Sequence, residues 1–475
     1  MNPGNLPERT RGRESGVRVR RPLEGKMDRT PNRMPVSTRL QRIAEVARSN
    51  AGTAIKVLSY HLDVDLLTMA HELTSRTSAP GIDGYTAEFY GVNLAARLTD
   101  RVDRVKSGRY RAPPVRRAYI PKANRKEMRA IGIPTVEDKV LQRAVLMLLE
   151  PIYEHDFLDC SYGFRPGRNA HMALETLWQN VMKLGGCWVL EVDIRAFFDT
   201  LDHRHLQAIV RQRVGDGVIQ GLIGKWLNAG VLEGEALSYP ERGTPQGGVI
   251  SPLLANIYLH EVLDRWFQEM ALPRLRGKAF LIRYADDFVM GFERLEDARK
   301  IYEVLPKRFG KYGLTLHPSK TRLIDFRHPE VRQRAGNPGN LEEGLPDTFD
   351  FLGFTHHWSR SKSKRWFVRR QTAKDRFTRS VRKISDWCRE NLHLSVDEQR
   401  KKLALRVRGH YGYFGITGNM VRIQGFLLAV ERTWYRWLNR RSQRPLWWWQ
   451  FAKMLQAKPL PPPCLPHSVF RRANA

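Results

Sequence analysis

Two adjacent aspartates, Asp286 and Asp287, interrupt an apolar stretch of the chain. Residues 279–282 before them and Val289 and Met290 after them are apolar. Alternating apolar residues on both sides predict a β-hairpin with the two acids at its turn. Neighbouring buried carboxylates cost free energy unless they are paired or bound to a metal ion. The pair is therefore either an acidic surface turn or a site for a divalent cation, and a third carboxylate would favour the cation site.

Asp193 is a candidate for that third carboxylate. It lies near the end of residues 187–194, whose apolar character predicts a buried strand. Three carboxylates together could hold two divalent ions roughly 3.5–4 Å apart, which activate an attacking hydroxyl and stabilise a leaving phosphate oxygen. Magnesium suits such a site because it is a hard cation that binds carboxylates and substrate phosphates.

Basic and glycine-rich segments could supply the substrate side. Residues 120–134 predict two strands joined by a basic hairpin, a suitable place to bind a triphosphate. Residues 242–248 form a glycine-rich turn that runs into a helix and could offer backbone amides to a phosphate. This turn lacks the Gly-Lys-Ser/Thr ending of a P-loop, which disfavours a kinase or ATPase.

The charge of the chain points to a polyanionic partner. Its 475 residues include 80 Lys and Arg against 49 Asp and Glu, a formal net charge of +31. Such an excess favours nucleic acid as the partner, with a membrane surface as the competing explanation. The sequence has no apolar run of about 18 residues and no signal peptide, so we expect no membrane contact. We expect a cytoplasmic, nucleoid-associated bacterial protein or an organellar one. The four cysteines are too far apart for a zinc ribbon or a disulfide framework.

Several elements must position these residues. Residues 1–54 predict a basic, mostly disordered leader, and residues 55–114 carry short amphipathic segments. Residues 115–357 alternate strand-like and helix-like segments, as an α+β domain does. Within them, Thr135 caps a helix to about residue 154, and Ser251-Pro252 opens another.

The last part of the chain predicts helices. An apolar stripe from Phe377 to Trp387 indicates one helix, and a capping box from Ser395 to Glu398 opens a second, to about residue 407. Residues 409–418 predict a loop, 420–438 a third helix, and 458–466 a proline-rich tail. The basic residues on these helices suit either a bundle lying against nucleic acid or a solvated face, and the interleaved aromatic residues favour the bundle.

A set of blocks resembles, in order and spacing, the motifs of reverse transcriptases, and most of all the group II intron-encoded reverse transcriptase/maturase family. The blocks are 122–134, 161–166, 193–199, 243–248, 284–288, 316–321 and 351–354. Residues 81–84 are similar to the N-terminal extension of that family, and about 372–455 to its maturase-specific thumb. The resemblance covers about residues 60–468.

This resemblance implies a right-hand polymerase of the α+β class. It places an N-terminal extension at 55–114, fingers and palm at 115–357, a helical thumb or maturase domain at 358–440, and a short basic, proline-rich, nucleic-acid-binding tail at 441–475. It makes Asp193, Asp286 and Asp287 the catalytic carboxylates. The same residues, with the Ile194 carbonyl, would bind two Mg²⁺ ions.

The resemblance also assigns substrate contacts. Lys122 and Arg129 would contact the incoming triphosphate, Gln246 would lie near the nucleotide, and Phe198 would exclude a ribose 2′-hydroxyl. Lys320 would be a general acid toward pyrophosphate, although an ordinary surface lysine is the alternative. RNA or DNA contacts are expected from a set of basic residues: Arg165, Arg376, Arg379, Arg382, Lys383, Arg408, Arg440 and Arg441.

Two departures from the family pattern stand out. Ala130-Ile131 replaces the usual Pro-Leu after Arg129, which loosens the loop and keeps the cation. The cysteine pairs of the zinc-bearing endonuclease domain of many relatives are missing, so we expect no target-DNA cleavage by this chain and an external source of primer.

The expected function is that of an RNA-directed DNA polymerase that also binds its intron RNA and assists splicing and mobility. Its partners would be intron RNA, an RNA template with a DNA primer, deoxynucleoside triphosphates and target DNA. One alternative is a domesticated reverse transcriptase in DNA repair or phage defence. Another is a splicing-only RNA-binding maturase, which the three intact aspartates argue against. An RNA-templated RNA polymerase is disfavoured by the bulky Phe198.

Overall fold

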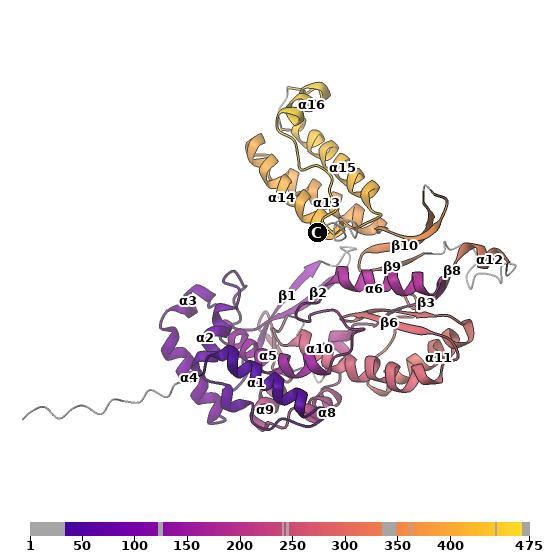
Figure 1. Cartoon of the computed structure of the whole chain (residues 1–475). Helices are drawn as coiled ribbons and strands as arrows, with labels where there is room; N and C mark the ends of the chain where they lie inside the picture. Colours follow the sequence, from indigo (N-terminus) through magenta and orange to yellow (C-terminus); the bar gives the residue numbers. More distant parts are fainter. Residues whose placement is uncertain are drawn as a thin grey trace, which may run out of the picture.

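The computed structural model describes residues 34–121, 127–239, 242–243, 247–334, 348–361, 363–441 and 444–467. Within these ranges helices surround three sheets, which confirms the predicted α+β class (Figure 1). Two predicted nucleotide contacts, Lys122 and Gln246, lie outside the described residues, as do residues 1–33 of the predicted leader.

The N-terminal part is a group of helices packed around a long helix, α5. Thr135 caps α5 as predicted, because its hydroxyl accepts a hydrogen bond from the backbone N–H of Asp138. The prediction of a disordered leader is wrong for residues 36–49, which form α1 and bury Ile43 and Ala47. The elements are α1 (Val36–Ser49), η1 (Ser59–His61), α2 (Val64–Glu72), α3 (Ala87–Gly91), α4 (Leu94–Lys106) and α5 (Val136–Asp156).

A small sheet follows these helices and begins with the predicted hairpin. Strands β1 (Val115–Pro121) and β2 (Met128–Ile133) pair antiparallel, and the basic residues 122–126 that join them lie outside the described residues. Strands β4 (Val231–Glu233) and β5 (Ala236–Ser238) extend the sheet in the order β2-β1-β4-β5. Helices α8 (His203–Arg213) and α9 (Gly217–Leu227) come before β4 in the chain.

The central sheet is antiparallel, in the order β6-β7-β3-β8. Side chains alternate between its two faces, as the pleat requires. One face, including Leu190 and Met290, packs in the core that contains the helices α10, η2 and α11, and the other, including Val189, packs with α6. The elements are α6 (Ala170–Lys183), β3 (Gly186–Asp193), α7 (Phe197–Thr200), α10 (Ser251–Leu259), the π-helix η2 (His260–Ala271), η3 (Leu272–Arg274), β6 (Ala279–Tyr284), β7 (Asp287–Phe292), α11 (Leu295–Lys311), β8 (Arg322–Arg327) and α12 (Pro329–Arg334).

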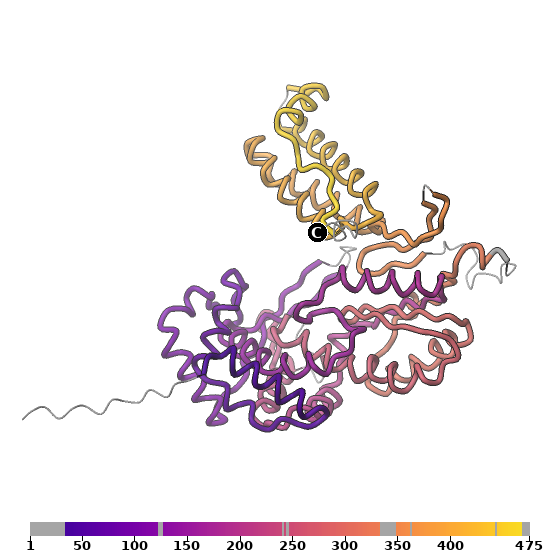
Figure 2. The backbone as a smooth tube through the Cα atoms, in the orientation of Figure 1, coloured from indigo at the N-terminus to yellow at the C-terminus, as the bar shows by residue number. Residues whose placement is uncertain are grey.

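The C-terminal part is a helical unit that stands away from the N-terminal helices (Figures 1 and 2). A three-stranded sheet, β11-β10-β9, precedes it and packs with α6, so residues 358–361 and 363–372 are strand and turn although the sequence places them in the helical thumb. The elements are β9 (Phe349–Phe351), β10 (Phe354–Arg360), β11 (Trp366–Thr372), α13 (Lys374–Glu390), α14 (Val396–Phe414), α15 (Met420–Leu438) and α16 (Trp448–Ala457).

Two predictions for this unit need correction. The predicted loop at 409–418 is wrong for residues 409–414, because α14 continues to Phe414 and buries His410 and Tyr411, whereas residues 415–418 lie between α14 and α15 as predicted. The predicted tail from 441 contains α16, whose Phe451 is buried against Trp434. In the part of the chain that the structure describes, no helix is both long and apolar enough to cross a membrane.

Candidate active site

The central sheet brings the three predicted aspartates to one of its ends. Asp193, the last residue of β3, is the register partner of Asp287, the first residue of β7. Asp286 precedes Asp287 in the turn between β6 and β7, so the predicted acidic hairpin is confirmed. Directly opposite residues of an antiparallel pair have Cβ atoms about 4.5–5.5 Å apart. The structure thus collects two carboxylates by strand pairing and the third by the turn.

Burial and mutual repulsion raise the pKa values of Asp286 and Asp287. Burial first, and then the nearby charges of Asp286, Glu191 and Asp193, raise the pKa of Asp287 to about 7. Burial and the charge of Asp193 also raise the pKa of Asp286. The ionised carboxylates therefore destabilise one another in the protein alone, and a bound cation would remove that cost.

Lys320 supplies one cation. Its Nζ lies 2.9 Å from Oδ2 of Asp193, and the pair is exposed. His317, three residues earlier, donates its backbone N–H to the Asp193 carbonyl at 2.8 Å, which holds the segment that carries Lys320 against the end of β3. The structure therefore places Lys320 beside one of the three carboxylates.

The donor set suits a hard metal ion, although the described residues contain no group of three His, Cys, Asp or Glu side chains already arranged to hold one. Asp193, Asp286 and Asp287 offer only carboxylate oxygens, which Mg²⁺ prefers. Ile194 pairs with Leu316 in an isolated bridge. The hydrogen bonds on either side of that bridge use the Asp193 carbonyl and the Arg195 N–H, so the Ile194 carbonyl remains a candidate metal ligand.

Phe198 lies directly after the strand that carries Asp193. It is half-buried in the short helix α7, with its ring edge-on to the buried Phe197 at 5.3 Å between centroids. Gly243 packs against this helix, since a Cβ at that position would meet the carbonyl oxygens of Phe198 and Asp199 at 2.8 and 2.9 Å. These contacts hold the backbone of α7 and one edge of the Phe198 ring, five residues after Asp193 at the end of β3.

The hairpin β1–β2 places Arg129 near the same site. Arg129 is exposed, and its charge opposes the rise that burial causes in the pKa of Asp286. Gly247 packs on this hairpin, because a Cβ there would lie 2.7 Å from the Gly132 carbonyl oxygen. Gly247, at the end of the glycine-rich segment, therefore meets the hairpin, while Gln246 and Lys122 themselves lie outside the described residues.

Arg165 lies in a different environment from the one the sequence suggests. It is only 6% exposed and bound to Glu154, with Nη2 at 2.7 Å from Oε1. Its Nη1 also donates to the carbonyls of Leu158 and Ser161, at 2.7 and 2.9 Å. This guanidinium is occupied inside the protein, so the predicted nucleic-acid surface does not include it.

The other predicted basic residues lie on the helical unit. Arg376 lies at the start of α13, close to Asp287. Its positive charge opposes the rise that burial causes in the pKa of Asp287. Arg379 is bound to Asp375, with Nη2 at 2.9 Å from Oδ2. The remaining members are exposed: Arg382, Lys383, Arg408, Arg440 and Arg441.

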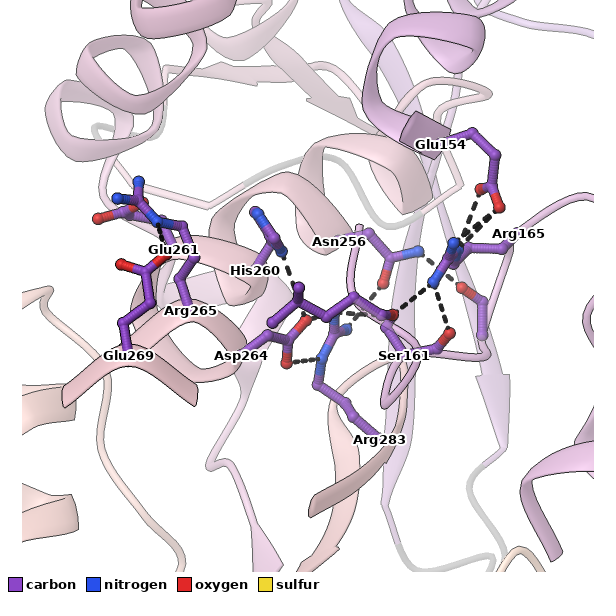
Figure 3. A network of polar contacts seen from close by, with 12 residues as sticks. Glu154, Ser161, Arg165, Asn256, His260, Glu261, Asp264, Arg265, Glu269 and Arg283 are labelled. Carbon is purple, nitrogen blue, oxygen red and sulfur yellow. Dashed lines mark hydrogen bonds and ion pairs between the residues drawn. The ribbon is translucent and has the colours of Figure 1, made fainter. Parts of the chain in front are cut away.

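Two residues of the site were missed from the sequence. Glu191, two residues before Asp193, adds a negative charge near Asp287 and is bound to Arg322 at 2.5 Å. Arg283, three residues before Asp286, is fully buried and lies beside Asp264, Asn256 and Ser161 (Figure 3). A charged residue inside an apolar strand would have indicated a buried partner, and this pattern is visible in the sequence at Arg283.

The chain is similar in sequence to a known protein family and to individual proteins of it. A family model described as "Reverse transcriptase (RNA-dependent DNA polymerase)" matches residues 120–356. Protein YkfC of Escherichia coli is 40% identical over 299 residues, which cover 54% of this chain and 77% of that protein.

Two further proteins are similar to this chain, the first over a smaller share of its own length and the second at lower sequence identity. The group II intron-encoded protein LtrA of Lactococcus lactis is 38% identical over 289 residues, 58% of this chain and 47% of LtrA, so the chain spans about half the length of LtrA. Telomerase of Candida albicans has a TM-score of 0.41 and 12% identity, over 78% of this chain and 66% of that one.

Proposed function

The chain belongs to the group II intron-type reverse transcriptases, and from this premise we propose that it extends a DNA primer on an RNA template with deoxynucleoside triphosphates. The observation that carries the proposal is the register pairing of Asp193 with Asp287, with Asp286 in the adjoining turn. We further propose that it binds the RNA of a group II intron and assists its splicing and mobility, since LtrA is by name a group II intron-encoded protein. A domesticated role in repair or defence, and a splicing-only role, are the alternatives.

In this proposal the three parts of the chain have separate tasks. The central sheet is the palm, the hairpin β1–β2 belongs to the fingers, and the helices α13–α15 form the thumb. Two Mg²⁺ ions on Asp193, Asp286 and Asp287, with the Ile194 carbonyl, would activate the primer hydroxyl and neutralise charge on the phosphates. Arg129 would bind the triphosphate, and Phe198 would lie against the sugar.

In this proposal Lys320 gives a proton to the leaving pyrophosphate. Because it touches Asp193 at the end of β3, an incoming triphosphate bound at the aspartates would meet its ammonium. We expect Lys320→Gln to lower the maximal rate of primer extension by about 10²-fold or more, as loss of a general acid does. RNA affinity should not change, and Lys320→Arg, which keeps the positive charge but does not give up its proton, should not restore the rate. An unchanged single-turnover rate for Lys320→Gln would instead show that this is an ordinary surface lysine.

RNA binding by the helical unit should depend on salt. We expect RNA affinity to fall by about 10³-fold or more between 50 and 200 mM salt if roughly six or more phosphates are bound. The triple variant Arg382→Ala/Lys383→Ala/Arg408→Ala should reduce the slope of log K against log salt by about 0.7–0.9 for each phosphate that it no longer neutralises. Filter binding over a salt series measures both quantities.

A matched control lies on α11, on the opposite side of the central sheet from the thumb (Figure 1). Arg299 and Lys300 are exposed there, so Arg299→Ala/Lys300→Ala removes surface charge away from the proposed RNA face. Equal slopes for the control and the thumb variant would contradict the assignment of the RNA face.

The decisive experiment for the function uses purified protein in two assays. Primer extension on an RNA template tests the polymerase, and a splicing assay with the RNA that flanks the reading frame tests the intron role. Extension without any effect on splicing would favour the domesticated enzyme. Splicing help without extension would favour the splicing-only maturase.

A further inference from the structure

Arg283 is the feature below the active site that the proposed chemistry leaves unexplained. It lies on β6, three residues before Asp286, and its side chain is completely buried. An unpaired buried charge is very unfavourable, so its partners must account for its presence.

Each nitrogen of the Arg283 guanidinium has a partner (Figure 3). Nε donates to Oδ1 of Asp264 at 2.7 Å and Nη2 to its Oδ2 at 2.5 Å, a two-point ion pair with the π-helix η2. Nη1 donates to Oδ1 of Asn256 on α10 at 2.9 Å, and Nη2 also donates to the Ser161 hydroxyl at 2.8 Å. The guanidinium thus joins β6 to two helices and to the loop before α6.

The remaining contact reaches the active site. Nη1 of Arg283 also donates to the Ala285 carbonyl at 3.1 Å. Ala285 has φ of 58°, in the left-handed region, which is unfavourable for a residue with a Cβ atom. Such a conformation persists only where neighbouring contacts hold it. Arg283 therefore holds the residue immediately before the two aspartates.

A second set of contacts, from the loop that contains Gly163, supports the same turn. Gly163 lies against it so closely that a Cβ would sit 2.5 Å from the Ala285 backbone nitrogen. The Gly163 carbonyl accepts a hydrogen bond from Nδ2 of Asn256 at 2.6 Å, so the amide that meets Arg283 also fixes this loop. Arg283 pairs with the loop through its own backbone, with bonds to Cys160 and Tyr162 of 2.8 and 2.9 Å.

We propose that Arg283 is a positioning residue for the reaction: its buried pair with Asp264 holds the Ala285–Asp286 turn, and so fixes where Asp286 and Asp287 stand when they bind divalent cations. The expected effect on the rate of primer extension rests on the proposed polymerase function. The expected effect on the affinity for divalent cations does not depend on that function. A purely structural ion pair would act on stability alone.

The test replaces the pair by apolar residues of similar size, Arg283→Met/Asp264→Leu. Exchanging both members of a buried ion pair is often neutral for stability, so we expect a folded protein with a melting temperature near that of the wild type. We expect the maximal rate of primer extension to fall about 10²-fold, because small displacements of catalytic groups have effects of that size. Mn²⁺ affinity of the protein alone, measured by calorimetry, should fall about tenfold or more.

A matched control lies in the same helix. Arg265 and Glu269 form an exposed ion pair in η2, with Nε at 3.0 Å from Oε1 and no contact with the turn among the hydrogen bonds of the described residues. Arg265→Met/Glu269→Leu should leave the rate and Mn²⁺ affinity unchanged. Asp286→Asn/Asp287→Asn is the negative control, because it should not bind Mn²⁺ at this site.

Two further variants keep the proposal falsifiable. Arg283→Lys keeps the charge and loses the two-point geometry, so it should show the same losses, and it decides the question if the double variant does not fold. Gly163→Ala keeps Arg283 but adds a Cβ atom that clashes with the backbone of Ala285. It should therefore also weaken Mn²⁺ binding. Wild-type rate and Mn²⁺ affinity in a folded Arg283 variant, or a lower melting temperature with unchanged Mn²⁺ affinity, would overturn the proposal.

Failure of the proposed function is distinguishable from failure of this inference. If wild-type protein does not extend a primer, the polymerase proposal fails, and the Mn²⁺ measurements still judge the positioning role. If the wild type extends and the folded variants match it, only the positioning role fails.

Discussion

Asp286→Asn/Asp287→Asn is expected to abolish primer extension, with a loss on the order of 10³-fold or more, while RNA binding persists. The two side chains stand at the end of the central sheet, where Asp287 faces Asp193. Asparagine keeps their size and removes the charges that would hold metal. Single-turnover extension measures the rate, and filter binding with template RNA checks that the fold and the RNA surface survive.

For the same variant we expect a gain in thermal stability of the metal-free protein, although its activity is lost. Burial, then the charges of Asp286, Glu191 and Asp193, raise the pKa of Asp287 from its ordinary acidic range to about 7. A carboxyl group whose pKa is higher in the folded protein favours folding when protonated, and this contribution is lost as the pH rises through about 7. In EDTA at pH 8, the variant should therefore melt at or above the temperature of the wild type.

The pH dependence separates this explanation from a general structural role. Between pH 5 and pH 8 the metal-free wild type should lose stability relative to Asp287→Asn, and saturating Mg²⁺ should reduce the difference. Retained extension by the double variant would contradict the site assignment. A strong loss of stability with loss of activity would instead show that the acids support the fold.

Phe198→Ala is expected to raise the incorporation of ribonucleotides relative to deoxynucleotides by roughly 10- to 100-fold, which corresponds to removing one steric clash of about 1–3 kcal/mol. The ring is half-buried in α7, directly after the strand of Asp193, and it leans on the buried Phe197. Removing the ring would make room for a 2′-hydroxyl beside the site where the sugar is expected. The measurement compares kcat/KM for matched ribo- and deoxynucleoside triphosphates.

Phe198→Tyr is the matched control, because it keeps the ring and should keep the selectivity for deoxynucleotides. Extension with deoxynucleotides should decrease only modestly in Phe198→Ala, since the aspartates and Lys320 are untouched. Unchanged sugar selectivity in a folded Phe198→Ala variant would count against a steric gate at this position.

The elements that carry the site follow from local patterns. The hairpin with its acidic turn, the buried strand that ends at Asp193, and the Thr135 and Ser395 caps are all found where the sequence predicts them. Each depends on residues only a few positions apart, through apolar alternation or a side chain that reaches a nearby backbone N–H. Such short-range effects are present in the sequence itself.

The misplaced elements depend on packing between distant segments. Glycines at 409 and 412 suggest a loop, since each costs a helix about 1 kcal/mol. In the structure His410 stacks on Phe426 of α15 with ring centroids 3.6 Å apart, and burial of this face outweighs the cost of the glycines. Residues 36–49 likewise form a helix because Ile43 and Ala47 find a partner in α5.

The sequence by itself identified the candidate residues: three aspartates and, through the resemblance to reverse transcriptases, a lysine and a phenylalanine, in a chain of net charge +31. Only the tertiary structure decided what surrounds them. It buried Arg165 in the protein, brought Arg376 near Asp287, and paired Arg283 with Asp264 below the acidic turn. The reason is physical. Spacing along the chain fixes which side chains share a strand or a turn, whereas a buried charge takes its partner from whichever distant segment the fold brings beside it.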